Sequence, residues 1–141
     1  MSSVSIQAVS RTFEGRQGQR THALLPVDFE VRDNDFVTIL GPSGCGKSTL
    51  LRIVAGLDHA TSGRVLLDGV PVEGPGADRG MVFQSYTLFP WLTIEQNIRF
   101  GLRERGMPEA QQKERAAYFI AKVGLRGCEQ HFPKQLSGGM Q

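Results

Sequence analysis

The sequence predicts an α/β fold built around a phosphate-binding loop, on the evidence of one motif and the two elements beside it. Residues 41–49 read Gly-Pro-Ser-Gly-Cys-Gly-Lys-Ser-Thr and fit the motif G-x-x-x-x-G-K-[S/T]. Before them, residues 36–40 form a short apolar run that is typical of a buried strand. After them, residues 48–55 are expected to form a helix that Gly56 ends. The order of strand, glycine-rich loop and helix is the context that the motif requires.

The residue types of the loop suit the phosphates of a nucleotide. Glycines let the backbone turn tightly, so that successive N–H groups point inward at phosphate oxygens, and the N-terminus of the following helix adds partial positive charge. We expect Lys47 to reach the β- and γ-phosphates and the Ser48 hydroxyl to bind Mg²⁺. The loop therefore predicts a nucleotide-binding site that also holds Mg²⁺. The loop residues expected to bind the nucleotide and Mg²⁺ are Gly41, Pro42, Ser43, Gly44, Cys45, Gly46, Lys47, Ser48 and Thr49.

The bulk composition is that of an ordinary globular domain. With 141 residues, 40% of them hydrophobic and 21% charged, the chain is about one domain with room for a core. Its net charge of only +2 provides no basic surface, so we expect no nucleic-acid partner. No apolar run approaches the roughly 20 residues of a membrane helix. Residues 1–13 also lack the pattern of a signal peptide.

The cysteine pattern favours a reducing compartment. Cys45 and Cys128 are the only cysteines, they lack C-x-x-C spacing, and a disulfide at Cys45 would obstruct a nucleotide. This indicates reduced thiols in a cytosolic protein. We interpret Cys45 as a loop residue that contributes its N–H. The alternative is a thiol made reactive by Lys47 and the helix N-terminus.

Two strands are expected ahead of the phosphate-binding loop. Residues 4–9 and 27–31 alternate in the manner of half-buried strands, and the polar, glycine-containing segment 15–20 predicts a turn. Together they predict an antiparallel β layer. Phe13 follows the first of these strands and is either a core aromatic or a ring that stacks on adenine.

The middle of the chain predicts a hairpin and then a further strand. Residues 64–67 and 70–72 flank Asp68-Gly69, the two-residue signature of a tight hairpin turn. This position argues against Asp68 as a metal-binding carboxylate at the end of a core strand. Residues 81–83 form a short apolar run that predicts a buried strand ending at Gln84. A polar residue at the carboxyl end of such a strand lies where ligands bind in α/β sheets.

The last third of the chain predicts helices. An aromatic and apolar cluster, Tyr86 to Trp91, is equally compatible with a core and with an interface. Thr93 and Gln96 form a capping box that opens a helix. A second helix is expected after Pro108. The apolar stripes expected on these helices are Ile94, Ile98 and Leu102 on the first, and Ala116, Phe119, Ile120 and Val123 on the second.

The order of these motifs resembles the ATP-binding subunit of ABC transporters. Leu136-Ser137-Gly138-Gly139 is similar to the signature motif of that family, and Gln84 is similar to its Q-loop glutamine. The resemblance covers the whole chain and implies a P-loop NTPase of the ABC ATPase type. Such a fold has a parallel core sheet, an N-terminal antiparallel β layer and a helical subdomain. The segments 74–80 and 88–91 resemble the importer branch for nitrate, sulfonate or taurine.

The resemblance also implies roles for individual residues. Lys47 and Gln84 are expected to be catalytic, Ser48 and Gln84 to bind Mg²⁺, and Phe13 to stack on adenine. Ser137, Gly138 and Gly139 are expected to touch the γ-phosphate of ATP bound to a second subunit in a head-to-tail dimer.

The expected setting is a transporter at the membrane. Gln84 and Tyr86 to Trp91 are expected to contact a membrane permease, and a periplasmic binding protein takes part indirectly. The protein is therefore expected in the cytoplasm, peripheral on the inner face of the membrane. Residues 1–88 are expected to form the nucleotide-binding core with the Q-loop, and residues 89–141 the helical subdomain up to the signature.

The chain departs from the family pattern after the signature. The family places the Walker B Asp, the catalytic Glu and the switch His beyond that point, and the sequence stops at Gln141. We therefore expect a fragment whose C-terminal part is missing, which folds poorly and hydrolyses ATP negligibly alone, because general-base catalysis contributes roughly 10²–10⁴-fold to rate.

Three alternatives remain open at this stage. A small-molecule kinase with the same loop would need an acceptor site or lid, and the Leu136–Ser137–Gly138–Gly139 motif argues against it. A non-transport ABC ATPase is disfavoured by the near-neutral charge and the importer-like segments. A non-catalytic module that sequesters ATP or a full-length partner predicts the same motifs. The transported solute and the permease are not specified by the sequence.

Overall fold

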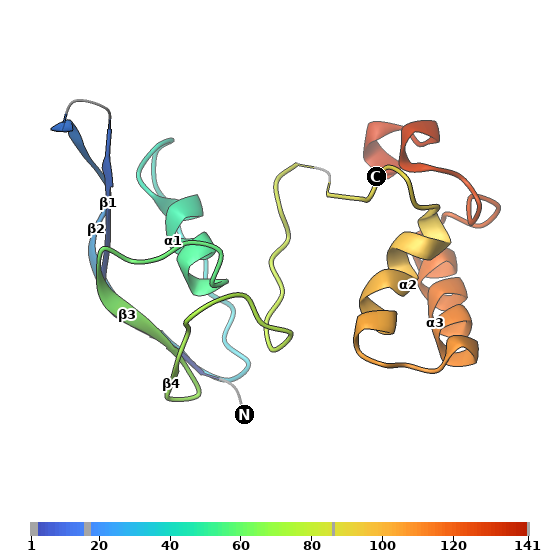
Figure 1. Ribbon diagram of the computed structural model, residues 1–141, viewed down its shortest axis with the longest axis horizontal. Coiled ribbons are helices and arrows are strands. Elements are labelled where there is room, and N and C mark those ends of the chain that lie inside the picture. The colour runs from blue at the N-terminus through green and yellow to red at the C-terminus, as the bar shows by residue number, and fades with distance from the viewer. Residues whose placement is uncertain (1–2, 16–17, 86, 141) are drawn as a thin grey trace. The chain divides into compact units, whose positions relative to one another are not determined.

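The computed structural model describes residues 3–15, 18–85 and 87–140 (Figure 1). The chain forms two compact units, Met1–Val82 and Phe83–Gln141. Of the expected interface residues, Tyr86 lies outside the described part.

The first unit is organised around one antiparallel sheet. Its strands are β1 (Val4–Glu14), β2 (Arg20–Val31), β3 (Ser62–Leu67) and β4 (Val70–Pro71), in the order β2-β1-β3-β4 (Figure 1). The expected β layer is therefore confirmed, but β1 and β2 are longer than the alternation indicated. As a result, Phe13 lies within β1 and not after it.

Helix α1 (Lys47–Val54) completes the core of this unit and confirms the expected helix to within one residue. Its C-terminus is closed by Gly56, whose N–H bonds to Ile53 O at 3.0 Å and whose φ is +73°. The next residue, Leu57, donates to Arg52 O at 2.8 Å, which completes the pattern of a glycine-terminated helix. The buried core consists of Ile6, Val9, Leu24, Leu50, Ile53 and Val65.

The β3–β4 hairpin confirms the turn expected at Asp68-Gly69. Both residues have positive φ, +51° and +81°, as a two-residue hairpin turn of type I′ requires. The Asp68 carboxylate accepts a hydrogen bond from Ser3 N at 2.6 Å. Asp68 is thus a turn residue.

Two expected strands are wrong. Residues 36–40 and 81–83 are not strands, and apolar side chains that a buried strand would cover are exposed: Phe36 by 95%, Leu40 by 87% and Val82 by 97%. The physical reason is pairing. A strand must satisfy its N–H and C=O groups on a neighbour, and in the described residues the ladders involve only β1 to β4, all antiparallel. An apolar run predicts that a segment is buried, but it does not show that a neighbouring strand is available to pair with that segment.

The second unit is a helical hairpin with two short turns of 3₁₀ helix. It comprises α2 (Ile94–Glu104), α3 (Glu109–Lys122), η2 (Pro133–Gln135) and η3 (Gly138–Met140). Its buried cluster is Ile94, Ile120 and Leu136. In the described part of the chain, no helix combines the length and apolar character needed to cross a membrane.

The helix signals of the second unit are largely confirmed. Thr93 Oγ1 accepts from Gln96 N at 3.2 Å, and Gln96 Oε1 accepts from Thr93 N at 2.9 Å, which is the expected capping box. The stripe expected on α3 is only half correct. Ala116 and Ile120 are buried, whereas Phe119 and Val123 are 41% and 63% exposed. The buried face of α3 is narrower than its apolar residues indicate.

Candidate functional site

The phosphate-binding loop has the backbone that its glycines permit. Gly44 and Gly46 adopt left-handed φ values of +82° and +93°. A Cβ added at Gly46 would collide with the carbonyl of Ala23 and would lie 3.1 Å from Leu24 Cδ1. The end of the loop therefore rests directly on β2, and only glycine fits there.

The N-terminus of α1 is free to receive an anion. Its N-cap is Gly46, no side chain caps it, and its first turn holds no acidic residue. The first N–H groups of a helix have no partner inside the helix and carry partial positive charge. Because no side chain of the protein caps them, these N–H groups suit phosphate oxygens.

Lys47 occupies the inside of the loop. Its Nζ donates to Gly41 O at 2.8 Å and to Pro42 O at 2.7 Å, and lies 3.5 Å from Cys45 Sγ. The ammonium is thus directed at the space that the loop encloses. Ser48, the next residue, is exposed on the first turn of α1. Ammonium, backbone N–H and hydroxyl groups at one place are a donor set that fits a polyphosphate with Mg²⁺.

Both cysteines are free thiols. Cys45 is exposed in the loop and Cys128 is half-buried in the second unit. The reactivity of Cys45 remains a hypothesis.

Phe13 lies on the strand pair that supports the loop. Leu24, which the end of the loop approaches, is the register partner of Arg11 across β1 and β2. The Arg11 guanidinium lies 4.5 Å from the centroid of the Phe13 ring, and Phe13 is 42% exposed. Of the two interpretations of Phe13, this exposure favours a surface ring over a core aromatic.

Gln84 and the aromatic segment belong to the second unit. Gln84 is exposed in a bend, so the expected placement at the end of a buried strand is wrong. The Phe89 ring packs on Phe100 and Trp91, with centroid distances of 4.6 Å and 5.5 Å. Trp91 is 69% exposed. The segment thus has a packed base and an accessible edge, which combines the two interpretations of this cluster.

Asn97 holds this aromatic turn, a role that no sequence motif predicts. Its Oδ1 accepts from Phe89 N at 2.8 Å. Its Nδ2 lies within 3.2 Å of the carbonyl oxygens of Phe89, Leu92 and Thr93. One amide side chain therefore bonds to four backbone groups of the turn. The available signal was a polar residue at i+3 from Ile94, within the apolar stripe of α2.

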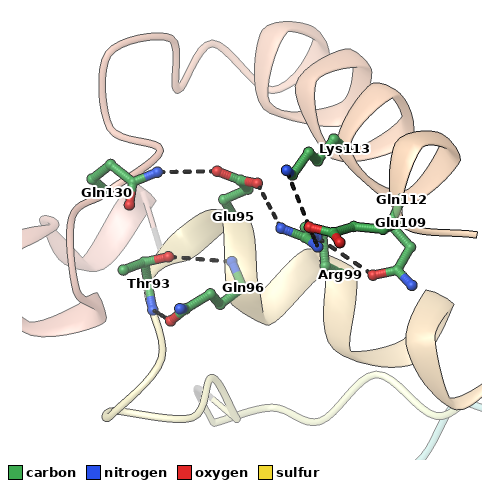
Figure 2. Close-up of polar contacts among 8 residues, drawn as sticks. All are labelled: Thr93, Glu95, Gln96, Arg99, Glu109, Gln112, Lys113 and Gln130. Atoms are coloured by element: carbon green, nitrogen blue, oxygen red, sulfur yellow. Dashed lines mark hydrogen bonds and ion pairs between the residues drawn. The ribbon is translucent and has the colours of Figure 1, made fainter.

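The segment before the signature motif is fixed to the N-terminus of α2. Ile94 N donates to His131 O at 2.9 Å and Glu95 N donates to Glu129 O at 3.0 Å. Gln130 Nε2 also donates to Glu95 Oε2 at 3.0 Å (Figure 2). These contacts supply the acceptors that the first N–H groups of a helix require.

The signature residues themselves follow this fixed segment. Leu136 is buried, whereas Ser137, Gly138 and Gly139 are exposed, with Met140 N bonded to Ser137 O at 2.9 Å. The motif is thus anchored by its leucine and presents its small residues at the surface.

Arg99 joins α2 to α3. It contacts Glu95 at 3.1 Å, Glu109 at 3.3 Å and Gln112 at 3.4 Å (Figure 2). Lys113 adds a second cation 3.1 Å from Glu109. The hydrogen bond and charge of Lys113, followed by those of Arg99, lower the pKa of Glu109 below the ordinary glutamate value. These side chains join α2 to α3.

A family model described as ABC transporter matches residues 24–141. The chain belongs to the ABC transporter family. The match includes the phosphate-binding loop and the signature residues. The fold class inferred from the sequence is thereby confirmed at the level of the family.

Several curated ABC proteins are similar to this chain. A Methanocaldococcus jannaschii protein named as an uncharacterised ABC transporter ATP-binding protein is 54% identical over 138 residues, which are 98% of this chain and 51% of that protein. The nitrate import ATP-binding protein NrtD of Synechocystis is 46% identical, with 98% and 52% covered. The taurine import ATP-binding protein TauB of Burkholderia pseudomallei is 48% identical, with 100% and 54% covered. The chain thus spans about half the length of these relatives.

Solved ABC cassettes share its fold. A dimeric ATP-binding cassette in a post-hydrolysis state, bound to ADP and Pi, superposes with a TM-score of 0.85 at 31% identity. The alignment covers 97% of this chain and 64% of the cassette. A dimeric bacterial ABC transporter cassette gives a TM-score of 0.86.

Proposed function

We propose that this ABC chain is part of the ATP-binding subunit of an importer, in which ATP binding and hydrolysis drive solute uptake through a membrane permease. One observation carries the proposal: α1 begins without a capping side chain or an acidic residue, behind a glycine loop that encloses the ammonium of Lys47. The similarity to nitrate and taurine import proteins supports a solute of that oxyanion class.

In this proposal the loop binds the triphosphate and Phe13 binds the base. The N–H groups of residues 41–49 and the ammonium of Lys47 hold the phosphates, and the exposed Ser48 hydroxyl is a ligand for Mg²⁺. Gln84 is the second proposed Mg²⁺ ligand and, with Lys47, a catalytic residue. Mg²⁺ would neutralise charge on the transferred phosphoryl group.

The proposed partners use the surfaces of the second unit. Exposed Ser137, Gly138 and Gly139 would meet ATP on a second subunit in a head-to-tail dimer, and the similar solved cassettes are described as dimeric. Gln84 and Tyr86 to Trp91 would contact the permease, and a periplasmic binding protein would act indirectly. The subunit would then lie on the cytoplasmic face of the membrane. Residues 1–88 and 89–141 are the proposed nucleotide-binding and signature-bearing parts.

The test is calorimetric titration of the purified 141-residue chain with Mg·ATP, together with a turnover assay. Lys47→Ala should weaken binding about 10- to 100-fold, the range expected for losing charged hydrogen bonds to phosphate. Lys113→Ala, which removes an exposed lysine on α3, is the matched control and should leave binding unchanged.

The turnover arm separates the proposal from its alternatives. We expect this chain to bind ATP but to hydrolyse it negligibly. Asp68 lies in a hairpin turn, so it does not supply a Mg²⁺-binding carboxylate at the end of a core strand. Equal affinity in the chain and in Lys47→Ala would contradict the phosphate site. Turnover comparable to that of an intact ABC subunit would contradict the proposed dependence on a longer chain.

A further inference from the structure

Phe13 does not stand alone on β1, because a planar cation covers one face of its ring. The Arg11 guanidinium lies 4.5 Å from the ring centroid, while 42% of the Phe13 surface is still exposed. A cation over an aromatic face is attracted by the ring quadrupole. Contact on one side together with exposure leaves the other face of the ring as a candidate stacking surface.

Arg11 is itself held in place by Asp58. Its Nη2 lies 2.8 Å from Asp58 Oδ1, and the two side chains are only 23% and 20% exposed. Asp58 Oδ1 also accepts from His59 N at 2.8 Å, which fixes the carboxylate. Meanwhile the Arg11 Nε is buried and has no hydrogen-bond partner in the described residues. The guanidinium is thus held by one end only, in a position that does not maximise its own hydrogen bonding.

The chain around this pair is firmly attached to β1. Thr61 N donates to Ser10 O at 2.8 Å, and Thr12 N donates to Thr61 Oγ1 at 3.0 Å. The segment that carries Asp58 therefore begins at the end of α1 and is bonded to the strand on both sides of Arg11. The position of the Asp58 carboxylate is set by two elements and not by a mobile loop.

We propose that Arg11, held by Asp58, is a positioning residue that orients the Phe13 ring for a planar nucleobase. The inference rests on the proposed ATP site. By covering one face, the guanidinium restricts rotation of the ring before the base arrives, so that less entropy is lost on binding. The base then stacks on the opposite face. Lysine does not replace arginine here, because an ammonium is a point charge that cannot stack as a plane.

The test compares two probes that differ by the base. ATP contains the base and the triphosphate, whereas inorganic tripolyphosphate contains only the phosphates. Phe13→Ala should weaken ATP about tenfold or more, the effect of losing one base–aromatic stack, and leave tripolyphosphate unchanged. Arg11→Ala should weaken ATP about three- to fivefold, again without affecting tripolyphosphate.

Arg20→Ala is the matched control for charge. Arg20 pairs with Glu14 at 3.2 Å, lies on the same strand pair and is 70% exposed, so its loss removes the same charge without touching Phe13. It should not change the ratio of the two affinities. Arg11→Lys and Asp58→Asn nearly preserve the size of the side chain. Like Arg11→Ala, they are expected to lower the affinity for ATP relative to that for tripolyphosphate, so the test remains valid if Arg11→Ala unfolds the chain.

The outcomes distinguish the two levels of the proposal. If Phe13→Ala lowers the ATP affinity selectively but none of the Arg11 and Asp58 variants does, the positioning role is overturned and the base site stands. If Arg11→Ala weakens both probes equally, its role is general and the inference is again overturned. If Phe13→Ala has no selective effect, the proposed base site fails and the inference falls with it. If neither ATP nor tripolyphosphate binds the unsubstituted chain, both the proposed ATP site and the positioning role of Arg11 are overturned.

Discussion

At the scale of single residues, the phosphate-binding loop depends on one glycine more than on its neighbours. Gly44 and Gly46 have similar left-handed φ values, but only Gly46 is pressed against β2. A side chain at Gly44 would meet nothing within 4 Å, whereas one at Gly46 would meet the backbone of Ala23. The motif treats the two glycines alike, and the structure separates a conformational requirement from a packing requirement.

This difference predicts unequal costs for two alanine substitutions. Gly44→Ala should destabilise the chain by about 1 kcal/mol, the cost of the left-handed conformation alone. Gly46→Ala should cost roughly 2–4 kcal/mol, because a clash with backbone is added. Urea unfolding followed by circular dichroism measures both. Equal costs would show that the loop is not seated on β2.

At the scale of elements, short local signals were predictable and distant contacts were not. The capping box, the Asp68-Gly69 turn and the glycine end of α1 each depend on a few adjacent residues. The Arg11–Asp58 pair joins residues far apart in sequence, and no spacing rule connects them. The residues of the glycine-rich loop could therefore be picked out by a motif, whereas the contact between Arg11 and Asp58 could not.

The clamp made by Asn97 predicts a visible effect on the aromatic turn. Asn97→Ala should cost about 1–3 kcal/mol, because it removes the hydrogen-bond partner of the half-buried Phe89 N–H and of the Leu92 carbonyl. Trp91, the only tryptophan, should then show lower fluorescence anisotropy. Asn97→Asp keeps an acceptor for Phe89 N, so its stability and its anisotropy should lie between those of the unsubstituted chain and those of Asn97→Ala. Gln111→Ala, at an exposed site on α3, is the control. An unchanged anisotropy in Asn97→Ala would count against the clamp.

The α2–α3 pair predicts a pH dependence with a definite sign. Because the pKa of Glu109 is lowered in the folded chain, its contribution to stability is fully present above the ordinary glutamate pKa. That contribution is lost as the pH falls through the lowered pKa. Lys113→Met removes the leading cause and should raise the pKa of Glu109, as a carbon-13 titration can measure. Lys122→Met removes a cation that contacts Tyr118 instead, and should not change the pKa.

At the scale of the whole molecule, the antiparallel layer and the helical unit were predictable, whereas the parallel core sheet that the resemblance implies is not formed by the described residues. Residues 36–40 have the composition of a central strand, but Phe36 and Leu40 are among the most exposed apolar residues described. The composition of a segment indicates that it is suited to a buried strand once neighbouring strands pair with it. It does not report whether the partner is present in the same chain.

The exposure of Phe36 and Leu40 leads to a prediction opposite to that of a buried strand, in which polar substitutions would be costly. Phe36→Ser combined with Leu40→Ser should change the unfolding free energy by less than about 0.5 kcal/mol, as for other surface substitutions, and should reduce binding of a hydrophobic dye. Ile39→Ser, between them, should cost about 1–3 kcal/mol, because Ile39 packs against the core of the first unit. If the double variant proves as damaging as Ile39→Ser, residues 36–40 are buried together in solution.

The position of Lys47 also has a consequence for how the loop chooses its ligand. With two carbonyl oxygens already on its ammonium at 2.7 and 2.8 Å, the loop contains an internal competitor. An anion that takes these two donors of Lys47 competes with the carbonyl oxygens, so the apparent dissociation constant equals the intrinsic one divided by the fraction of loops in which the lysine is released. A single weak acceptor gains little from that exchange. A chain of phosphates, which would also accept hydrogen bonds from the helix N-terminus, is expected to gain more from the exchange.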